Sequence, residues 1–394
     1  MSVAFRLASL QFLQNGVFAG SVISLGTYLL QTLQFSGREV GMIYATNAIA
    51  ATVAPPAVGW LADRHFSADR LLAVLNGLAA VALVGCFYTT TFAAFYLVFL
   101  VFNLAFIPTF SLLTSVCFHQ LPEPARQFPG VRAWGTVGFM LFGLALSYFA
   151  LERSAAPLLI SAGLAVATVL AALTLPRVPT QPGFDWAALT GPEVRRIVRE
   201  PGMVVLLAAT LLSCIPSAFY YSFVNPFLNE IGWTNAAAKM SLGQFFEIGI
   251  LFAMPFFFRR LRFRRIFFWG LLAWGLRYLL FAFARPGHYE GLLYVGIAVQ
   301  GIAFAWIVIA AQIYVDNRVP VGLRSTAQGL VSFANQGIGI FVGSWLAGEV
   351  VLAQTLPGGG HDWSAIWLVP GVVGVATALG FWALFPRRAA LKNA

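Results

Sequence analysis

Apolar stretches of about 20 residues recur along the whole chain, and each is long enough to cross the ~30 Å hydrocarbon core of a bilayer. We count twelve of them. The composition agrees, because 59% of the 394 residues are hydrophobic and only 10% are charged, against roughly 25% charged in a soluble domain. The sequence therefore predicts an all-α integral membrane protein with twelve transmembrane helices. The expected spans are 7–33, 40–62, 71–91, 92–119, 132–151, 156–175, 202–228, 236–258, 266–283, 292–315, 323–351 and 365–385.

The net charge of +10 indicates an orientation in the membrane rather than a nucleic-acid partner. With both termini placed in the cytoplasm, nineteen basic residues fall on the inner side and only Arg38, Arg153, Lys239 and Arg285 fall on the outer side. This is the positive-inside asymmetry of membrane proteins. Inner-side basic residues also attract anionic lipids. We therefore expect a multi-pass protein of the bacterial cytoplasmic (inner) membrane with both termini cytoplasmic.

One long polar interruption divides the spans into six and six. It predicts an N-terminal bundle at 1–175, a cytoplasmic linker at 176–201 and a C-terminal bundle at 202–394. The halves also echo each other: Ala105-Phe106 corresponds to Ala303-Phe304, and Arg126 corresponds to Arg324, each pair 198 residues apart. Such a repeat predicts two pseudo-symmetric six-helix bundles with a substrate site near the midplane.

Glu247 is the candidate functional residue that stands out from the residues alone. It lies near the middle of the apolar run Met240 to Phe258, which contains no other charge. A carboxylate at that depth costs at least ~2.5 kcal/mol, and such residues usually serve function. Gln244 precedes it by three residues and so shares its helical face. The pair predicts a ligand contact, and the competing interpretation is a hydrogen-bonded helix contact.

The loop after the second span contains Gly59-Trp60-Leu61-Ala62-Asp63-Arg64. Together with the 6+6 arrangement, this motif resembles the major facilitator superfamily, in which it occupies the loop between spans two and three. A glycine there permits close helix packing, and the aspartate at a helix end can brace the neighbouring bundle through basic residues. The resemblance implies the major facilitator fold.

Short motifs in matching order along nearly the whole chain resemble the bacterial nucleoside:proton symporters of this superfamily. They are Phe12-Leu13-Gln14, Leu25-Gly26-Thr27-Tyr28, Pro108-Thr109, Val131-Arg132-Ala133-Trp134-Gly135-Thr136-Val137-Gly138-Phe139, Gln244 with Glu247, Ala273-Trp274-Gly275-Leu276-Arg277-Tyr278, Arg324-Ser325-Thr326-Ala327-Gln328-Gly329 and Asp362-Trp363. The resemblance implies which residues line the nucleoside pocket. They are Arg132, Thr136 and Phe139 on span five, Gln244 and Glu247 on span eight, and Phe304 on span ten.

This chain departs from the family pattern at three places. Ala218 and Tyr221 stand where span seven has polar amides, Gln300 stands where span ten has a tyrosine, and Ala305 replaces an acid that follows the span-ten phenylalanine. Tyr221 and Gln300 are polar and are included among the predicted substrate contacts. With the acid at 305 missing, Glu247 is the remaining candidate for carrying the proton.

Arg277, in span nine, is the other deeply placed charge. A buried guanidinium needs a partner, and Glu247 and Glu349 are the two carboxylates that could provide one. We predict a proton-coupling role for Glu247 and Arg277, with helix bracing as the alternative for Arg277. A nucleoside base also needs ring faces for stacking, and the aromatic candidates are Phe139, Phe304, Phe245, Trp134 and Trp306.

These patterns predict a secondary active transporter that imports nucleosides with protons by alternating access. Two alternatives remain open: a proton-coupled permease for sugars or other small polar solutes, and a membrane sensor that does not transport. The four histidines lie at span ends or in loops, and no metal or nucleophile motif is present, so we expect neither an enzyme nor a metal or cofactor. The expected partners are a nucleoside, protons and lipids, with the protein a monomer.

Overall fold

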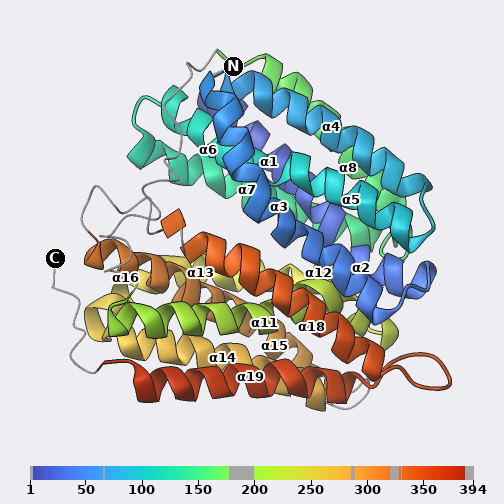
Figure 1. The fold of residues 1–394 in the computed structure, drawn as a ribbon, viewed down its shortest axis with the longest axis vertical. Helices are drawn as coiled ribbons and strands as arrows, with labels where there is room; N and C mark the ends of the chain where they lie inside the picture. Colours follow the sequence, from blue (N-terminus) through green and yellow to red (C-terminus); the bar gives the residue numbers. More distant parts are fainter. Residues whose placement is uncertain are drawn as a thin grey trace. The chain divides into compact units, whose positions relative to one another are not determined.

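The regular elements in the described part of the chain are helices, apart from one isolated bridge between Thr355 and His361. The computed structural model describes residues 3–64, 67–176, 199–284, 289–319, 328–329 and 331–386 (Figure 1). Within them, 10 helices are long and apolar enough to cross a membrane. These ten occupy the third to twelfth predicted spans, and α1 and α3 occupy the first two. The predicted all-helical membrane fold is confirmed.

The chain forms two compact units, and each is considered by itself. Unit 1 comprises residues 1–184, 221–229 and 234–238. Its helices from the first half of the chain are α1 (Val3–Val22), α2 (Leu25–Thr27), η1 (Tyr28–Thr32), α3 (Gly37–Arg64), α4 (Ala68–Tyr88), α5 (Phe92–Phe106), α6 (Thr109–Gln120), α7 (Pro124–Tyr148) and α8 (Ala156–Leu173). Helix α1 packs against α7 and α8, and α4 packs against α5 and α8.

Unit 2 comprises residues 185–220, 230–233 and 239–394. The helices of the second half are α11 (Pro201–Glu230), α12 (Ala236–Met240), α13 (Leu242–Arg260), α14 (Phe263–Phe283), α15 (Glu290–Phe304), η2 (Ala305–Ile309), α16 (Ala310–Arg318), η4 (Phe333–Gly339), α18 (Ile340–Ala353) and α19 (Trp363–Leu384). Helix α14 packs against α15 and α19, and α13 packs against α15. The end of α11 and most of α12 belong by their contacts to unit 1.

The fourth and tenth spans are interrupted at equivalent positions. Helix α5 runs from Phe92 to Phe106 and α15 from Glu290 to Phe304, an offset of 198 residues at both ends. Each therefore ends on the phenylalanine of the Ala-Phe pair that the internal repeat identified. Pro108 follows the first interruption, and a π-helical segment, η2, follows the second. Such interruptions of a helix often accompany functional sites.

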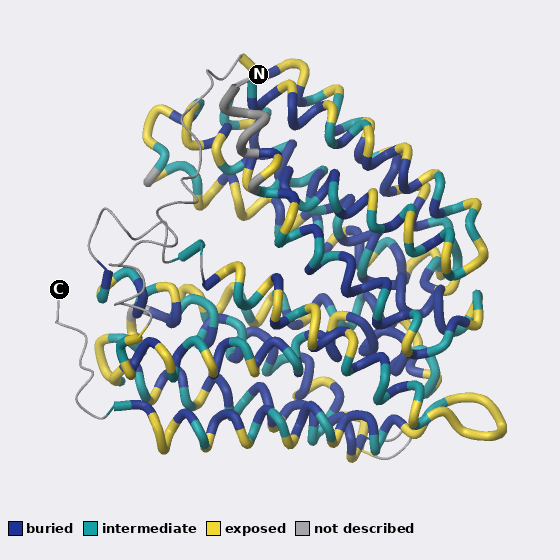
Figure 2. The backbone as a smooth tube through the Cα atoms, in the orientation of Figure 1, coloured by how far each residue is buried: buried dark blue, intermediate teal, exposed yellow. Residues whose placement is uncertain are grey.

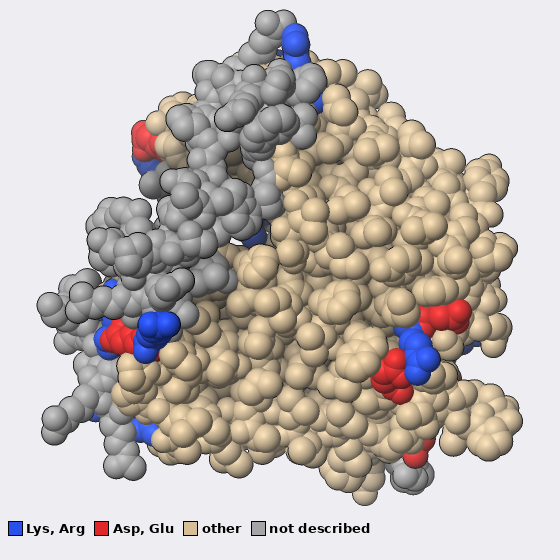
Figure 3. All heavy atoms as spheres, viewed as in Figure 1, with Lys and Arg blue, Asp and Glu red and all other residues tan. Residues whose placement is uncertain are grey.

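Burial follows the pattern expected in a lipid solvent. Within each unit the buried residues line the inner helix faces and the exposed residues the outward faces (Figure 2). The outward faces carry large apolar side chains such as Val81 (70% exposed), Leu97 (61%) and Phe252 (85%). On the face shown in Figure 3, charged atoms of the described residues gather near helix ends. Apolar exposed faces of this kind are stable in hydrocarbon.

Several features predicted from the sequence lie outside the described residues. They are most of the linker at 176–201, the side chains of the motif from Gly59 to Arg64, and the stretch from Arg324 to Ala327. The predicted division of the chain at this linker stays a prediction.

Candidate functional site

The span-five motif places its three predicted contacts on one face of α7. Arg132, Thr136 and Phe139 are spaced i, i+4 and i+7, so they follow one another along a single helical stripe. Arg132 is exposed, while Thr136 and Phe139 are half-buried. In the described part of the chain, no hydrogen bond or ion pair occupies the Arg132 guanidinium. Its donors are therefore available to a ligand.

Two glycines of the same motif let α7 pack closely against α1, and this contact positions the face that carries Arg132, Thr136 and Phe139. A Cβ atom at Gly138 would lie 2.3 Å from the carbonyl oxygen of Phe12, and one at Gly135 would lie 2.4 Å from Nδ2 of Asn15. Larger side chains at these two positions would force α7 away from α1. Small residues allow such close approach at helix interfaces in membranes. The spacing Arg-x-x-Gly-Thr-x-Gly-Phe thus separates a packing face from a face with free polar groups.

Residues from motifs that are far apart in the first half of the sequence contact each other between α1, α6 and α7. Nε2 of Gln14 on α1 donates to Oγ1 of Thr109 on α6 at 2.8 Å, and both side chains are fully buried. The Phe139 ring lies 6.3 Å from that of Phe18, which in turn lies edge-on to Phe110 at 5.6 Å. Phe139 therefore belongs to an aromatic group on α1, α6 and α7.

Glu247 and Gln244 lie on α13, against α15. Glu247 is half-buried, and no described residue donates a hydrogen bond to its carboxylate. The Gln244 amide nitrogen donates to backbone just before its helix when it faces the carbonyl oxygens of Met240 (3.0 Å) and Ser241 (3.1 Å). That orientation leaves the amide oxygen as an acceptor. The pair thus presents acceptors, which suit the hydroxyl donors of a ribose.

Gly301 on α15 positions Glu247, and the sequence did not single it out. A Cβ atom at Gly301 would lie 2.2 Å from the backbone nitrogen of Glu247 and 2.5 Å from the carbonyl carbon of Phe246. A Cβ atom at Gly243 would lie 3.2 Å from the carbonyl oxygen of Ile297 and 3.4 Å from the Cβ and Cγ atoms of Gln300. Gly243 and Glu247 are four residues apart and so share one face of α13, and Gly301 on α15 is a small residue next to the polar Gln300. A small residue beside polar groups on two spans is a pattern that could have identified this helix contact.

Arg277 is fully buried, and its partner differs from the expectation. Its Nη1 donates to Oε1 of Gln300, and its guanidinium stacks on the Tyr220 ring with 4.0 Å to the ring centre. No ion pair joins it to Glu247 within the described residues. Arginine is suited to such a place because its planar, weakly hydrated head both stacks and donates.

Gln300 therefore holds Arg277 in this structure, and Phe304 lies one helical turn further along α15. Gln300 is buried, with 3% of its side chain exposed, and Phe304 is half-buried. Ala305, which stands where the resemblance implies an acid, begins the π-helical segment η2 and is fully buried. Tyr221, by contrast, is 45% exposed and belongs to unit 1. The predicted contacts thus fall into two groups: one in unit 1 and one in unit 2.

Of the other aromatic candidates, Trp306 has a packing role. Its ring lies 5.0 Å from Phe257, and its Cβ lies 2.8 Å from where a Cβ at Gly270 would stand. Phe245 is 58% exposed.

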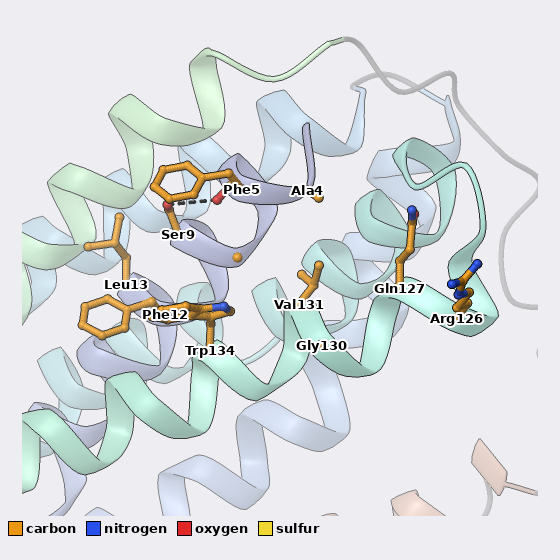
Figure 4. Close-up of a pocket in the computed structure, with 11 residues that line it drawn as sticks. Ala4, Phe5, Ser9, Phe12, Leu13, Arg126, Gln127, Gly130, Val131 and Trp134 are labelled. Carbon is orange, nitrogen blue, oxygen red and sulfur yellow. Dashed lines mark hydrogen bonds between the residues drawn. The ribbon is translucent and has the colours of Figure 1, made fainter. Parts of the chain in front are cut away.

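A large groove in unit 1 is lined by one aromatic candidate, Trp134, but by none of the other predicted contacts. It has a volume of about 780 Å³ and is formed by α1 and α7 (Figure 4). Phe5, Ser9, Phe12 and Trp134 line one part of it, and Arg126 and Gln127 lie toward the other end. At 100° per residue, Trp134 points to the side of α7 opposite Arg132 and Thr136. The groove is therefore not the predicted nucleoside site.

Comparison with known proteins identifies the family. The family model described as "Nucleoside H+ symporter" matches residues 1–390. A putative nucleoside transporter of Escherichia coli K12, YegT, is 33% identical over an alignment of 401 residues that covers 98% of this chain and 94% of that protein. The xanthosine permease of the same organism is 31% identical over 387 residues, covering 94% and 92% of the two chains.

A solved structure extends the likeness to three dimensions. The crystal structure of the nucleoside transporter NupG matches with a TM-score of 0.91 and 29% identity, covering 98% of this chain and 100% of that chain. The fold is that of the major facilitator superfamily, as the sequence resemblance implied. The protein is a multi-pass membrane transporter and belongs to the nucleoside H+ symporter family.

Proposed function

We propose that this protein imports nucleosides together with protons by alternating access, with Arg132, Thr136, Phe139, Tyr221, Gln244, Glu247, Gln300 and Phe304 as substrate contacts. One observation carries the proposal. A carboxylate in the middle of a membrane span, Glu247, has no hydrogen-bond donor among the described residues, and its backbone packs against Gly301 of α15, next to the Gln300 that binds Arg277. A charge left in that position is available to a ligand and to a proton.

The chemistry of a nucleoside matches the two groups of residues. Glu247 and the amide oxygen of Gln244 can accept hydrogen bonds from ribose hydroxyls, while Arg132 and Thr136 can donate to the base or the sugar. Phe139 and Phe304 supply ring faces, and stacking on a base is worth about 1–3 kcal/mol in nucleic-acid binding proteins. Each group of side chains therefore provides one part of what a nucleoside needs.

Glu247 is also the proposed proton carrier, since Ala305 provides no acid. When Glu247 is protonated, the membrane span carries no net charge there, and a carboxyl group can donate a hydrogen bond as well as accept one. When Glu247 releases the proton, we propose that the positive charge of Arg277 on the neighbouring helix α14 stabilises the carboxylate. Arg277 thus takes part in coupling without binding the proton.

Uptake of labelled uridine and adenosine into proteoliposomes, with and without an inward proton gradient, tests the proposal. We expect gradient-driven accumulation in the wild type. Glu247→Gln should abolish accumulation above the external concentration, because the carrier no longer releases a proton. Glu290→Gln, which removes an exposed carboxylate at the start of α15, is the matched control and should transport normally.

Other outcomes separate the alternatives. Uptake of a sugar without uptake of either nucleoside would establish a permease for other polar solutes. Binding without any uptake would establish a sensor. Uptake at the same level without a gradient, unchanged by Glu247→Gln, would make the protein a facilitator.

The orientation and the oligomeric state are part of the same proposal. Both termini lie in the cytoplasm of this inner-membrane protein, because the basic residues favour the inner side by nineteen to four. One chain suffices as a monomer, with anionic lipids at its inner surface. A cysteine introduced at Gln34, in the short segment after η1, should react with a membrane-impermeant maleimide in intact cells, whereas one at Gln120 should not.

A further inference from the structure

Glu152 forms a polar cluster in unit 1 that the site described above does not use. It lies between α7 and α8, and only 6% of it is exposed. Its carboxylate accepts four hydrogen bonds. Oε1 accepts from Oγ of Ser147 at 2.7 Å and from the backbone nitrogen of Ala237 at 3.0 Å. Oε2 accepts from Nδ2 of Asn225 at 2.9 Å and of Asn229 at 2.8 Å.

Three of these four donors come from the second half of the chain. Asn225 and Asn229 are one turn apart at the end of α11, and Ala237 lies on α12, whereas Ser147 lies at the end of α7. Ser147 also accepts from the backbone nitrogen of Ala238 at 2.8 Å. All the donors converge on one acidic group, and hydrogen bonds to a charged acceptor are shorter and stronger than neutral ones. The carboxylate therefore binds three separate segments of the chain.

Residues of the first predicted span also hold the end of α11 in unit 1. Oγ1 of Thr27 donates to Oδ1 of Asn225 at 2.5 Å, and Nε2 of Gln31 donates to the carbonyl oxygen of Pro226 at 2.9 Å. A Cβ atom at Gly26 would lie only 2.3 Å from the carbonyl oxygen of Ser222. The missing side chain of Gly26 makes this approach possible, and Pro226 has no N–H to donate to the Ser222 carbonyl.

We propose that Glu152 is an outer latch, a positioning residue that holds the end of α11 and the start of α12 against the α7–α8 turn and must release them when the outer side opens. The inference rests on the proposed alternating access and on the predicted orientation, which places this turn outside. A merely structural carboxylate would stabilise every conformation equally. A latch stabilises one conformation and so shifts the population between two states.

Glu230 provides a matched control on the same helix. Its Oε1 accepts from the backbone nitrogen of His361 at 2.7 Å, and its Oε2 contacts Nδ1 of His361 at 2.9 Å. Both residues belong to unit 2. Glu230 is therefore another hydrogen-bonded acid near the end of α11, but it does not join α11 to the α7–α8 turn.

A cysteine reporter at Ser222 measures opening directly. Ser222 is 1% exposed and lies against Gly26, so Ser222→Cys should react slowly with an impermeant maleimide added outside. In full-length protein in membrane vesicles, Glu152→Ala should raise the labelling rate at least about tenfold, because several hydrogen bonds to a charge are lost together. Asn229→Ala, which removes one donor, should raise the labelling rate by a smaller factor. This milder variant keeps the test informative if Glu152→Ala does not fold. Glu230→Gln should leave the labelling rate unchanged.

The outcomes separate this proposal from the function itself. An unchanged labelling rate in folded Glu152→Ala and Asn229→Ala would overturn the latch, and so would an equal increase in Glu230→Gln, which would indicate general loosening. Absence of nucleoside uptake in the wild type would contradict the proposed function instead. The labelling experiment would still report on opening in that case, because it does not depend on the substrate.

Discussion

At the scale of single residues, the unusual group is the fully buried Arg277. Its guanidinium donates to one amide oxygen, from Gln300, and stacks on Tyr220, while its Nε and Nη2 atoms have no hydrogen-bond partner in the described structure. A charge buried with so few acceptors depends strongly on each of them. The polarity of Gln300, where the family resemblance implies a tyrosine, follows from this need.

The Arg277 contact leads to a stability prediction. Gln300→Leu should lower the free energy of unfolding by about 2 kcal/mol, the typical value of a hydrogen bond to a charged group. Thermal unfolding in detergent measures this, and Gln312→Leu, at an exposed position on α16, serves as control. Equal melting temperatures for Gln300→Leu and the wild type would show that Gln300 does not hold the arginine.

At the scale of elements, helix pairs approach each other at glycines, and these contacts determine where polar groups lie. Gly138 brings α7 against α1, and Gly301 brings α15 against the backbone of Glu247. The helical spans were predictable because a bilayer requires about 20 apolar residues in sequence. The contacts were not predictable, because every span contains small residues and the choice among them depends on which helices become neighbours.

Gly301 and Gly291 on the same helix allow a paired test. Gly301→Ala should reduce nucleoside uptake at least about tenfold, because its Cβ would displace the backbone that carries Glu247 and small misplacements of binding groups are costly. Gly291→Ala should be neutral or slightly stabilising, since nothing lies within 4 Å of a Cβ there and alanine favours helices. Normal uptake by Gly301→Ala would mean that the α13–α15 contact can relax without effect on the site.

At the scale of the whole molecule, coupling connects the proton gradient to accumulation of substrate. If one proton accompanies each nucleoside, one unit of pH difference supplies about 1.4 kcal/mol and sustains roughly a tenfold concentration ratio at equilibrium. Measuring that ratio at several gradients gives the stoichiometry. A ratio that stays at one for every gradient, with uptake otherwise normal, would exclude coupling.

Exchange without net transport provides the companion measurement. Glu247→Gln should still exchange labelled for unlabelled nucleoside across the membrane, because its neutral side chain resembles the protonated state in charge. Net accumulation requires the empty, deprotonated carrier to return, and this step is lost. Loss of exchange as well would assign Glu247 to substrate binding alone.

The sequence by itself determined the membrane fold, the family and the candidate residues, since hydrophobic length, charge asymmetry and local motifs are properties of consecutive residues. Tertiary structure decided which polar groups become partners. Arg277 is bound by Gln300, 23 residues away, and Glu152 by Asn225, 73 residues away. In an apolar medium a polar side chain must find a partner wherever the packing of helices brings one, and spacing along the chain does not reveal that packing.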